Sequence, residues 1–163
     1  MNDEQALRRC IELARISVEH GSHPFGSLIT RDEELIAEGD NRVVTDMDAT
    51  AHAEVVAMRN ACRALGALNL DGCTLFTSCE PCWMCSCVIR ELGVSRVVFA
   101  ITSTRGGGYS GRFPILTDPD IERYGPPPRV TSGFMAEEAM ALWREIDWPA
   151  TRHQRWAQPP STA

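Results

Sequence analysis

The sequence contains no lysine, and all 16 of its basic side chains are arginines. Schiff-base catalysis, a phosphate-binding P-loop and a Ser-Lys catalytic dyad each need a lysine, so all three are excluded. The formal net charge is −6, and the arginines are scattered from Arg8 to Arg155 without a run. A simple basic patch for nucleic acid is therefore disfavoured, although folding can still gather dispersed arginines.

Long apolar runs are absent, and histidine is scarce. No stretch approaches the roughly 18 apolar residues that a membrane-spanning helix needs, and the first five residues are polar and acidic. We therefore expect a cytoplasmic protein with no membrane partner, whose seven cysteines stay reduced. The candidates for a metal-binding imidazole are His20, His23, His52 and His153.

Hydrophobic periodicity predicts alternating helices and strands. Helices are expected over 3–20, 51–65, 81–92 and 136–146, and strands over 25–30, 35–38, 73–77, 94–101 and 129–131. Glycines should stop the first three helices, and Asp48 or Thr50 is the expected N-cap of the second. The strands that flank helix 81–92 form a βαβ unit and are expected to be parallel.

No internal repeat and no linker divides the chain. At 163 residues and 44% hydrophobic composition, it is long enough for one domain with an ample core. We expect a single α/β domain over residues 1–163, with a core from about 3 to 146 and a loosely held tail over 147–163.

Four of the seven cysteines crowd into residues 77–87, which read TSCEPCWMCSC. Cys82 and Cys85 form a C-x-x-C at the start of a predicted helix, where one turn presents both sulfurs in the same direction and the helix N-terminus favours thiolates. His52 and Glu54 form an H-x-E at another predicted helix start. H-x-E followed by P-C-x-x-C is the signature of zinc-dependent deaminases.

These motifs predict a catalytic Zn²⁺ site. His52, Cys82 and Cys85 would supply three protein ligands and leave a fourth position for water, as in catalytic rather than structural zinc sites. Glu54 lies two residues past the histidine and would be the catalytic acid and base. It would take a proton from the water, pass it to a ring nitrogen and later protonate the departing amine.

Four segments resemble the cytidine-deaminase-like superfamily, in the branch of guanine, tRNA adenosine and cytosine deaminases. They are Phe25-Gly26, Asn41, the TAHAEV run at 50–55 and TSCEPCWMC at 77–85, and the resemblance covers about residues 5 to 101. It implies a three-layer α-β-α fold with a central mixed sheet of about five strands. A homodimer is also implied.

The resemblance also implies a set of substrate contacts. Asn41 would hydrogen-bond the base or sugar, and the neighbourhood of Glu80 would supply backbone contacts to the amine. Phe25, Ala53 and Cys79 are further candidates from the matching motifs. The loop after residue 101 borders the active site in this superfamily, which makes Tyr109 and Phe113 additional candidates.

The expected substrate is a small amino-substituted heterocycle, with guanine first because Pro24-Phe25-Gly26 and TSCEPC are most similar to guanine deaminases. Guanine deaminases of this fold carry Gly-Phe-Asp-Asp where this chain has Ser110-Gly111-Arg112-Phe113-Pro114. Cytosine, amino-triazines and nucleosides are therefore alternatives. A second hypothesis is a tRNA adenosine deaminase, and a third is a non-catalytic zinc module.

Other motifs have simpler interpretations. Cys79, Cys82 and Cys85 are spaced like the opening of a ferredoxin cluster motif, but Cys87 comes too early and lacks the required proline. Cys79 and Cys87 are therefore expected to be buried thiols. Residues 106–111 match a dinucleotide fingerprint by letter, but no helix opens there, so a mobile loop is expected. His20, His23 and His153 are expected at the surface, and a position near the pocket is the alternative for His23. The tryptophans expected in core or dimer contacts are Trp143, Trp148 and Trp156.

Overall fold

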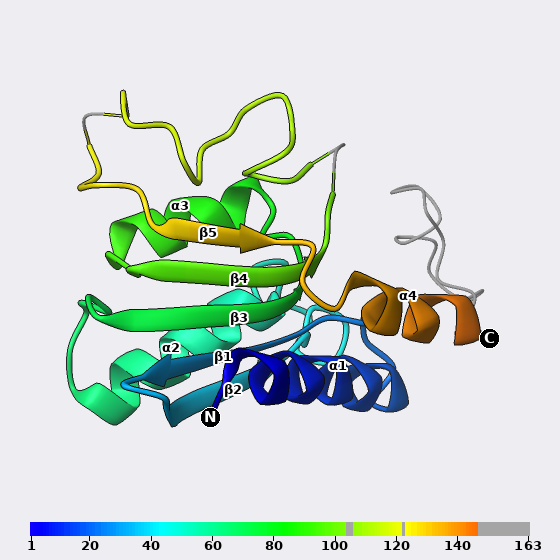
Figure 1. Cartoon of the computed structure of the whole chain (residues 1–163). Helices are drawn as coiled ribbons and strands as arrows, with labels where there is room; N and C mark the ends of the chain where they lie inside the picture. Colours follow the sequence, from blue (N-terminus) through cyan, green and yellow to red (C-terminus); the bar gives the residue numbers. More distant parts are fainter. Residues whose placement is uncertain (104–105, 122, 147–163) are drawn as a thin grey trace.

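The computed structural model describes residues 1–103, 106–121 and 123–146 (Figure 1). Their five strands form one sheet in the order β2-β1-β3-β4-β5. The strands are β1 (Gly26–Arg31), β2 (Glu34–Asp40), β3 (Cys73–Cys79), β4 (Arg96–Ile101) and β5 (Arg129–Ser132). β1 pairs antiparallel with β2 and β3, whereas β4 pairs parallel with β3 and β5. The predicted mixed sheet is confirmed, and so is its parallel βαβ unit.

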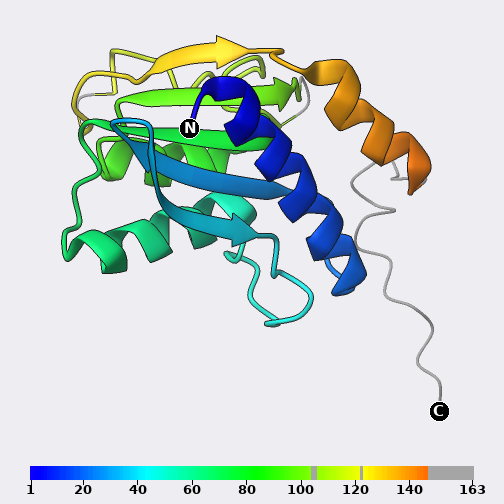
Figure 2. The ribbon, with the colours of Figure 1, turned by 60° about the horizontal axis from the view of Figure 1, so that its bottom comes forward.

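Helices cover both faces of this sheet, as Figures 1 and 2 show, and the predicted three-layer architecture is confirmed. The helices are α1 (Asp3–Glu19), α2 (Ala53–Leu65), α3 (Trp83–Glu91) and α4 (Ala136–Glu145). Successive strand residues point to opposite faces. Leu75 packs in the core cluster of α2 and α3, and its neighbour Phe76 packs in the cluster of α1 and α4.

Helix α1 begins with a capping box. The side chain of Asn2 accepts a hydrogen bond from the backbone N–H of Gln5, and the side chain of Gln5 accepts one from the backbone N–H of Asn2. The buried residues of α1 lie along one stripe and include Ala6, Leu7, Cys10 and Leu13. The predicted stop is confirmed, since the helix ends at Glu19 and Gly21 follows with φ of 81°.

Helix α2 begins later than the sequence predicts, and the expected cap is wrong. Its N-cap is His52, not Asp48 or Thr50. The Asp48 carboxylate instead accepts hydrogen bonds from the backbone N–H and the hydroxyl of Thr50, in a turn before the helix. The helix stops at Gly66, which is left-handed with φ of 63°, as predicted.

Tight packing sets the position of α2 on the sheet. A Cβ atom added to Gly39 of β2 would lie 2.5 Å from the backbone nitrogen of Ala57 and 2.5 Å from the carbonyl oxygen of Ala53. The helix therefore approaches the strand more closely than any side chain at residue 39 would allow. This contact fixes the helix whose N-terminus carries His52 and Glu54.

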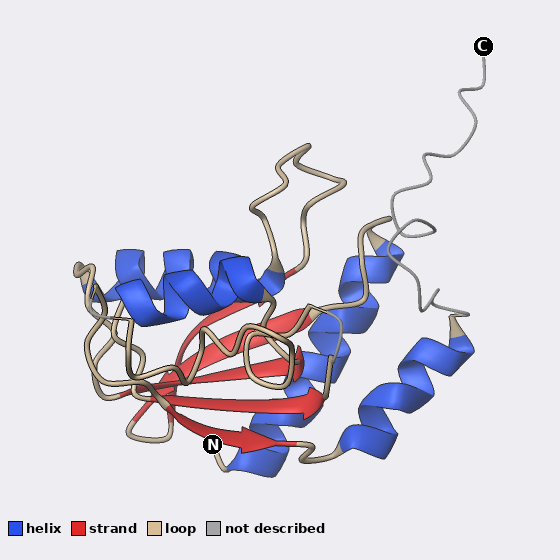
Figure 3. Cartoon of the chain, turned by 90° about the horizontal axis from the view of Figure 1, so that it is seen from above, coloured by secondary structure: helices blue, strands red, loops and turns tan. Residues whose placement is uncertain are grey.

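The carboxyl end of β3 leads directly into α3, and the view from above shows α2 and α3 on the same face of the sheet (Figure 3). None of the described helices is long and apolar enough to cross a membrane. The tail over 147–163 lies outside the described residues, and with it the expectations for His153, Trp148 and Trp156.

Candidate metal centre and active site

Two helix N-termini bring together the residues that the H-x-E and C-x-x-C motifs single out. His52 is the N-cap of α2, Cys82 is the N-cap of α3, and Cys85 lies in the first turn of α3. The Nδ1 atom of His52 lies 3.6 Å from Sγ of Cys82 and 3.5 Å from Sγ of Cys85, and the two sulfurs are 3.6 Å apart. The three ligand atoms could hold one metal ion.

The size of this triangle fits zinc. With Zn–S near 2.3 Å and Zn–N near 2.0–2.1 Å, tetrahedral coordination places two sulfurs about 3.8 Å apart and a sulfur and a nitrogen about 3.6 Å apart. The spacings here lie close to both values. Two thiolates and one imidazole are also a donor set that zinc prefers. The three side chains are arranged as the protein ligands of a zinc ion.

The site favours the thiolate form that binds metal. Hydrogen bonding with Cys85 lowers the pKa of the Cys82 thiol to about 4, and His52 adds to this effect against the opposing effect of burial. The N-terminus of α3 adds positive potential at both sulfurs. The same interaction with Cys82 raises the pKa of Cys85. A bound cation would favour the thiolate form of both side chains.

Glu54 lies in the first turn of α2, buried beside the ligand atoms. Burial raises its pKa to about 7, and the charge of His52 opposes this shift. Its carboxyl group also interacts with both cysteines of the triangle. A carboxyl group with a pKa near neutral can both accept and return a proton, which is the behaviour expected of a general acid and base.

Asn41, at the end of β2, presents an amide donor. The side chain is only 2% exposed, and its Oδ1 atom accepts hydrogen bonds from the hydroxyl of Ser22 and the backbone N–H of Val43. A backbone N–H can only donate, which fixes the oxygen on that side. None of the described residues accepts a hydrogen bond from the amide nitrogen of Asn41, which leaves it able to donate to a substrate oxygen or ring nitrogen.

Phe25 precedes β1 and contacts an aromatic side chain from α4. Its ring lies edge-on to Trp143, with centroids 5.9 Å apart, and the indole nitrogen of Trp143 donates to the carbonyl of Pro24. Trp143 was predicted in core or dimer contacts. It packs, partly buried, against the core cluster of α1 and α4, next to a predicted substrate contact. Ala53 is buried between His52 and Glu54 at the start of α2.

Tyr109 and Phe113 lie in the loop after β4, and both are partly exposed, at 37% and 52%. The Phe113 ring lies 5.5 Å from the ring of Trp83, which follows Cys82 of the metal triangle. The Tyr109 ring lies 5.8 Å from that of the buried Phe99. The loop therefore contacts the N-terminal turn of α3, and both aromatic residues remain candidates for substrate contacts.

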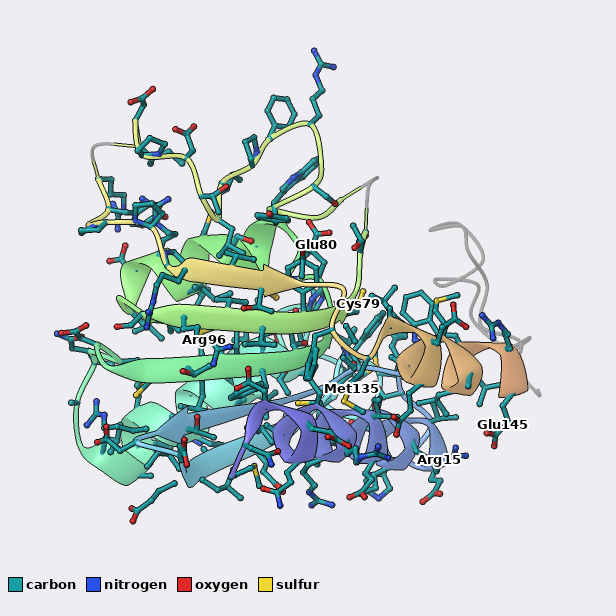
Figure 4. All side chains as sticks on the ribbon, in the orientation of Figure 1. Arg15, Cys79, Glu80, Arg96, Met135 and Glu145 are labelled. Atoms are coloured by element: carbon teal, nitrogen blue, oxygen red, sulfur yellow. The ribbon has the colours of Figure 1, made fainter. Side chains whose placement is uncertain are left out.

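Glu80 follows Cys79 at the end of β3, beneath the loop between β4 and β5 (Figure 4). Its backbone N–H donates to the carbonyl of Ile101. Its carboxylate oxygens accept four hydrogen bonds, three from backbone N–H groups and one from a hydroxyl, all in that loop. The side chain of Glu80 is therefore engaged with the protein. A backbone contact to the substrate amine stays a prediction.

The predicted burial of the other cysteines and histidines is confirmed for some residues and wrong for others. Within the described residues, which include every cysteine, the group that could hold a metal does not contain Cys79 or Cys87. Cys79 is buried as predicted, whereas Cys87 is only partly buried. His20 is exposed as predicted. The prediction for His23 is wrong, because it is only 7% exposed, directly after the Ser22 that orients Asn41.

Two residues that shape this region carry no sequence signal. In the sequence, Ser22 belongs to an irregular segment before β1. In the structure its hydroxyl donates to the amide oxygen of Asn41, 19 residues further along the chain. Arg90 sits in a helical pattern where an exposed arginine would be unremarkable, yet it is 4% exposed. Long-range contacts from single side chains leave no local periodicity, so only the structure reveals them.

Comparison with known proteins agrees with this geometry. Residues 1–101 match the family model described as the cytidine and deoxycytidylate deaminase zinc-binding region. A guanine deaminase from Bacillus subtilis (strain 168) is 55% identical over 105 residues, which cover 64% of this chain and 67% of that protein.

Two solved structures are similar along most of the chain. A guanine deaminase from Nitrosomonas europaea has a TM-score of 0.76 and 30% identity, and the match covers 90% of this chain and 85% of that chain. A structure from work on tRNA:A34 deaminases, which edit A to I at the wobble position of transfer RNA, has a TM-score of 0.80. It is 29% identical, and the match covers 85% of this chain and 99% of that chain.

Proposed function

Because the chain belongs to the family of the cytidine and deoxycytidylate deaminase zinc-binding region, we propose that it deaminates a free purine base, with guanine as the first candidate. The protein is a zinc-dependent hydrolytic deaminase of a nucleobase. In guanine, the bond between C2 and the exocyclic nitrogen would break, a C–O bond to the water oxygen would form, and ammonia would leave. The observation that carries the choice of guanine is the 55% identity to a guanine deaminase.

His52, Cys82 and Cys85 are the residues proposed to hold the zinc ion. A zinc ion with three protein ligands lowers the pKa of a water molecule in the fourth position to about 7. Glu54 would accept the proton of the attacking water, carry it to a ring nitrogen and return a proton to the leaving amine. Its burial beside His52 and Cys85 supports this role, because a carboxyl group near neutral pKa serves both transfers.

Asn41 would orient the base. Since Ser22 and Val43 occupy its amide oxygen, its amide nitrogen would donate to the carbonyl oxygen or a ring nitrogen of the purine. Phe25, Ala53 and Cys79 would line the same pocket, and Tyr109 and Phe113 would contact the base from the loop after β4. The aromatic side chains suit a flat heterocycle, which they can contact face-on or edge-on.

A screen for ammonia release tests the proposal. The zinc-loaded protein is incubated with guanine, cytosine, an amino-triazine and the corresponding nucleosides, and ammonia is measured by a coupled assay. We expect guanine to give the highest kcat/KM. Turnover of cytosine, an amino-triazine or a nucleoside without turnover of guanine would overturn the choice of substrate and keep the deaminase. Release of ammonia from none of them would favour a non-catalytic zinc module or the tRNA substrate below.

A tRNA adenosine deaminase is the second candidate, because of the similarity in fold to a structure from work on tRNA:A34 deaminases. The charge of this chain argues against it. Carboxylates pair with seven of the described arginines: Arg8, Arg9, Arg15, Arg42, Arg96, Arg123 and Arg144. Paired cations attract a polyanion less. Inosine formation in tRNA, with binding that weakens steeply as salt rises, would establish this alternative.

The proposal also covers organisation and location. Described residues share one sheet and two core clusters, which supports a single domain over residues 1–163. A homodimer is also proposed, because the resemblance to the cytidine-deaminase-like superfamily implies one. Seven free cysteines support a reducing, cytoplasmic location. Sedimentation at several protein concentrations tests the dimer, and fractionation of cells tests the location.

A further inference from the structure

The connection from β4 to β5 contains no helix or strand in its described residues, 102–103, 106–121 and 123–128, yet it is folded around two buried charged side chains. One is the anion Glu80 and the other is the cation Arg90, and each is 4% exposed. Neither side chain is part of the metal triangle or the proton transfer described above.

Glu80 binds the first part of this connection, residues 103 and 106–110, through hydrogen bonds to its carboxylate. One carboxylate oxygen accepts hydrogen bonds from the backbone N–H groups of Tyr109 and Ser110, at 2.9 and 2.7 Å. The other accepts from the backbone N–H of Ser103, at 2.7 Å, and from the hydroxyl of Ser110, at 2.6 Å. Hydrogen bonds to an ionised acceptor are roughly twice as strong as neutral ones. Four of them on one buried carboxylate fix the backbone of this segment.

The glycines of the segment explain how it comes so close. A Cβ atom added to Gly107 would overlap the carboxylate of Glu80 and lie 2.5 Å from the carbonyl oxygen of Ser103, and one added to Gly108 would lie 2.7 Å from Cβ of Ser86. Close packing therefore requires glycine at 107 and 108, whereas a Cβ atom added to Gly106, the first glycine of the dinucleotide fingerprint, would meet nothing within 4 Å. The mobile loop predicted here is, in the described residues, held by these contacts.

Arg90 binds the second part of the connection, residues 115–121 and 123–125, through hydrogen bonds from its guanidinium group. Its guanidinium donates to the carbonyl oxygens of Ile115, Asp118 and Gly125, at 2.9, 2.8 and 3.0 Å, and lies 5.4 Å from the centre of the Tyr124 ring. These carbonyls have no strand or helix to satisfy them. The buried guanidinium of Arg90 donates the hydrogen bonds that these carbonyls need. The buried carboxylate of Glu80 accepts those of the N–H groups in the first part.

Both parts contact the helix that carries two of the proposed zinc ligands. Gly107 forms a β-bridge with the ligand Cys82, and the backbone N–H of Gly108 donates to the carbonyl of Pro81. Trp83 contacts Phe113 in the same segment. A shift of the segment would therefore move one wall of the proposed substrate pocket, next to the metal triangle.

We propose that Glu80 and Arg90 are positioning residues that fold the β4–β5 connection into a preformed wall of the substrate pocket, so that Tyr109 and Phe113 are in place before the base binds. This rests on the proposed function of the same site. A preformed wall lowers the free-energy cost of ordering the pocket on binding, so its loss should raise KM more than it lowers kcat.

Amide hydrogen exchange on the zinc-loaded protein without substrate tests the positioning directly. In Glu80→Gln, the single amide oxygen should face the two N–H groups of Tyr109 and Ser110, and the NH₂ group should face Ser103. We expect exchange at Ser103 to rise at least about tenfold and exchange at Tyr109 and Ser110 to change less. In Glu80→Ala, all three amides should exchange faster. Unchanged exchange at all three in Glu80→Ala would overturn the proposal.

Kinetics and matched controls complete the test. Arg90→Met should release the second part of the connection and raise the KM for guanine by about tenfold or more, with zinc content unchanged. Glu38→Gln removes a carboxylate that pairs with Arg9 at the far edge of the sheet, and it should change neither KM nor exchange in the loop. An unchanged KM in both Glu80→Ala and Arg90→Met would overturn the role in binding. If the wild-type protein does not act on guanine, the proposed function fails, and the exchange experiment still decides the positioning.

Discussion

His52 and Cys82 occupy the same position in two different helices, and the Nδ1 atom of one lies 3.6 Å from the Sγ atom of the other. Each is the N-cap residue of its helix, and neither side chain caps its own backbone. Both side chains give up the hydrogen bond that an N-cap usually makes, and point instead at a common centre. The positive ends of two helices therefore meet at one point, which favours thiolates and partly negative groups there.

The ligand assignment predicts a difference between two cysteines of the same helix. Cys85→Ser should lower zinc affinity by at least about 100-fold, because it removes one of three protein ligands. Cys87→Ser changes a partly buried thiol two residues further on, outside the ligand triangle, and should keep one zinc per chain. Metal content after dialysis, measured by mass spectrometry, distinguishes them. Equal zinc content in the two variants would refute the assignment.

The role of Glu54 predicts loss of activity without loss of metal. Glu54→Gln keeps the size of the side chain and removes its ability to carry a proton, so kcat should fall by about 10²–10⁴-fold. Zinc content should be unchanged, because Glu54 is not among the three ligands. Ammonia release and metal content are measured on the same sample. Wild-type turnover in this variant would eliminate Glu54 as the proton carrier.

The sequence predicted the helices, the strands and the metal-binding group better than it predicted the loops around that group. The group that could hold a metal was predicted because local motifs, H-x-E and C-x-x-C, carry its residues at helix starts. The periodic segments predicted the parallel βαβ unit of the sheet. The N-cap of α2 was wrong because Asp48 can satisfy a turn as well as a helix end, and local sequence does not distinguish the two.

The wall of the proposed substrate pocket could not be predicted for a physical reason. Glu80 and Arg90 satisfy backbone groups that lie 23 to 35 residues away, and these groups belong to irregular segments without hydrophobic periodicity. A charged side chain in such a pattern is usually solvated, and only the packed chain shows that both are buried. The proposed contacts with the base lie in these segments, so the choice of substrate is the part of the function that the sequence predicts least.

The orientation of Asn41 predicts the effect of a single-atom change. Asn41→Asp keeps an oxygen for Ser22 and Val43 but replaces the amide donor by a second acceptor. We expect kcat/KM for guanine to fall by about 100-fold, because a substrate acceptor then faces a carboxylate. Asn60→Asp makes the same change in α2 at a side chain that donates to the carbonyl of Glu38, and should leave KM unchanged. A KM for Asn41→Asp equal to that of the wild type would exclude a contact with the base.

The close approach of β2 and α2 predicts a stability effect that also reaches the metal. In Gly39→Ala, the new methyl group would meet the backbone of Ala53 and Ala57, and overpacking of this kind costs about 1–3 kcal/mol. The midpoint of thermal unfolding should fall by about 3–10 °C for a chain of this size. Gly125→Ala is the control, because nothing lies within 4 Å of its added Cβ atom.

Since the displaced helix carries His52, Gly39→Ala should also bind zinc more weakly than Gly125→Ala does. Unfolding curves recorded with zinc and after chelation separate the two effects. If Gly39→Ala and Gly125→Ala unfold at the same temperature in both conditions, the contact between β2 and α2 does not hold the metal-binding helix in place.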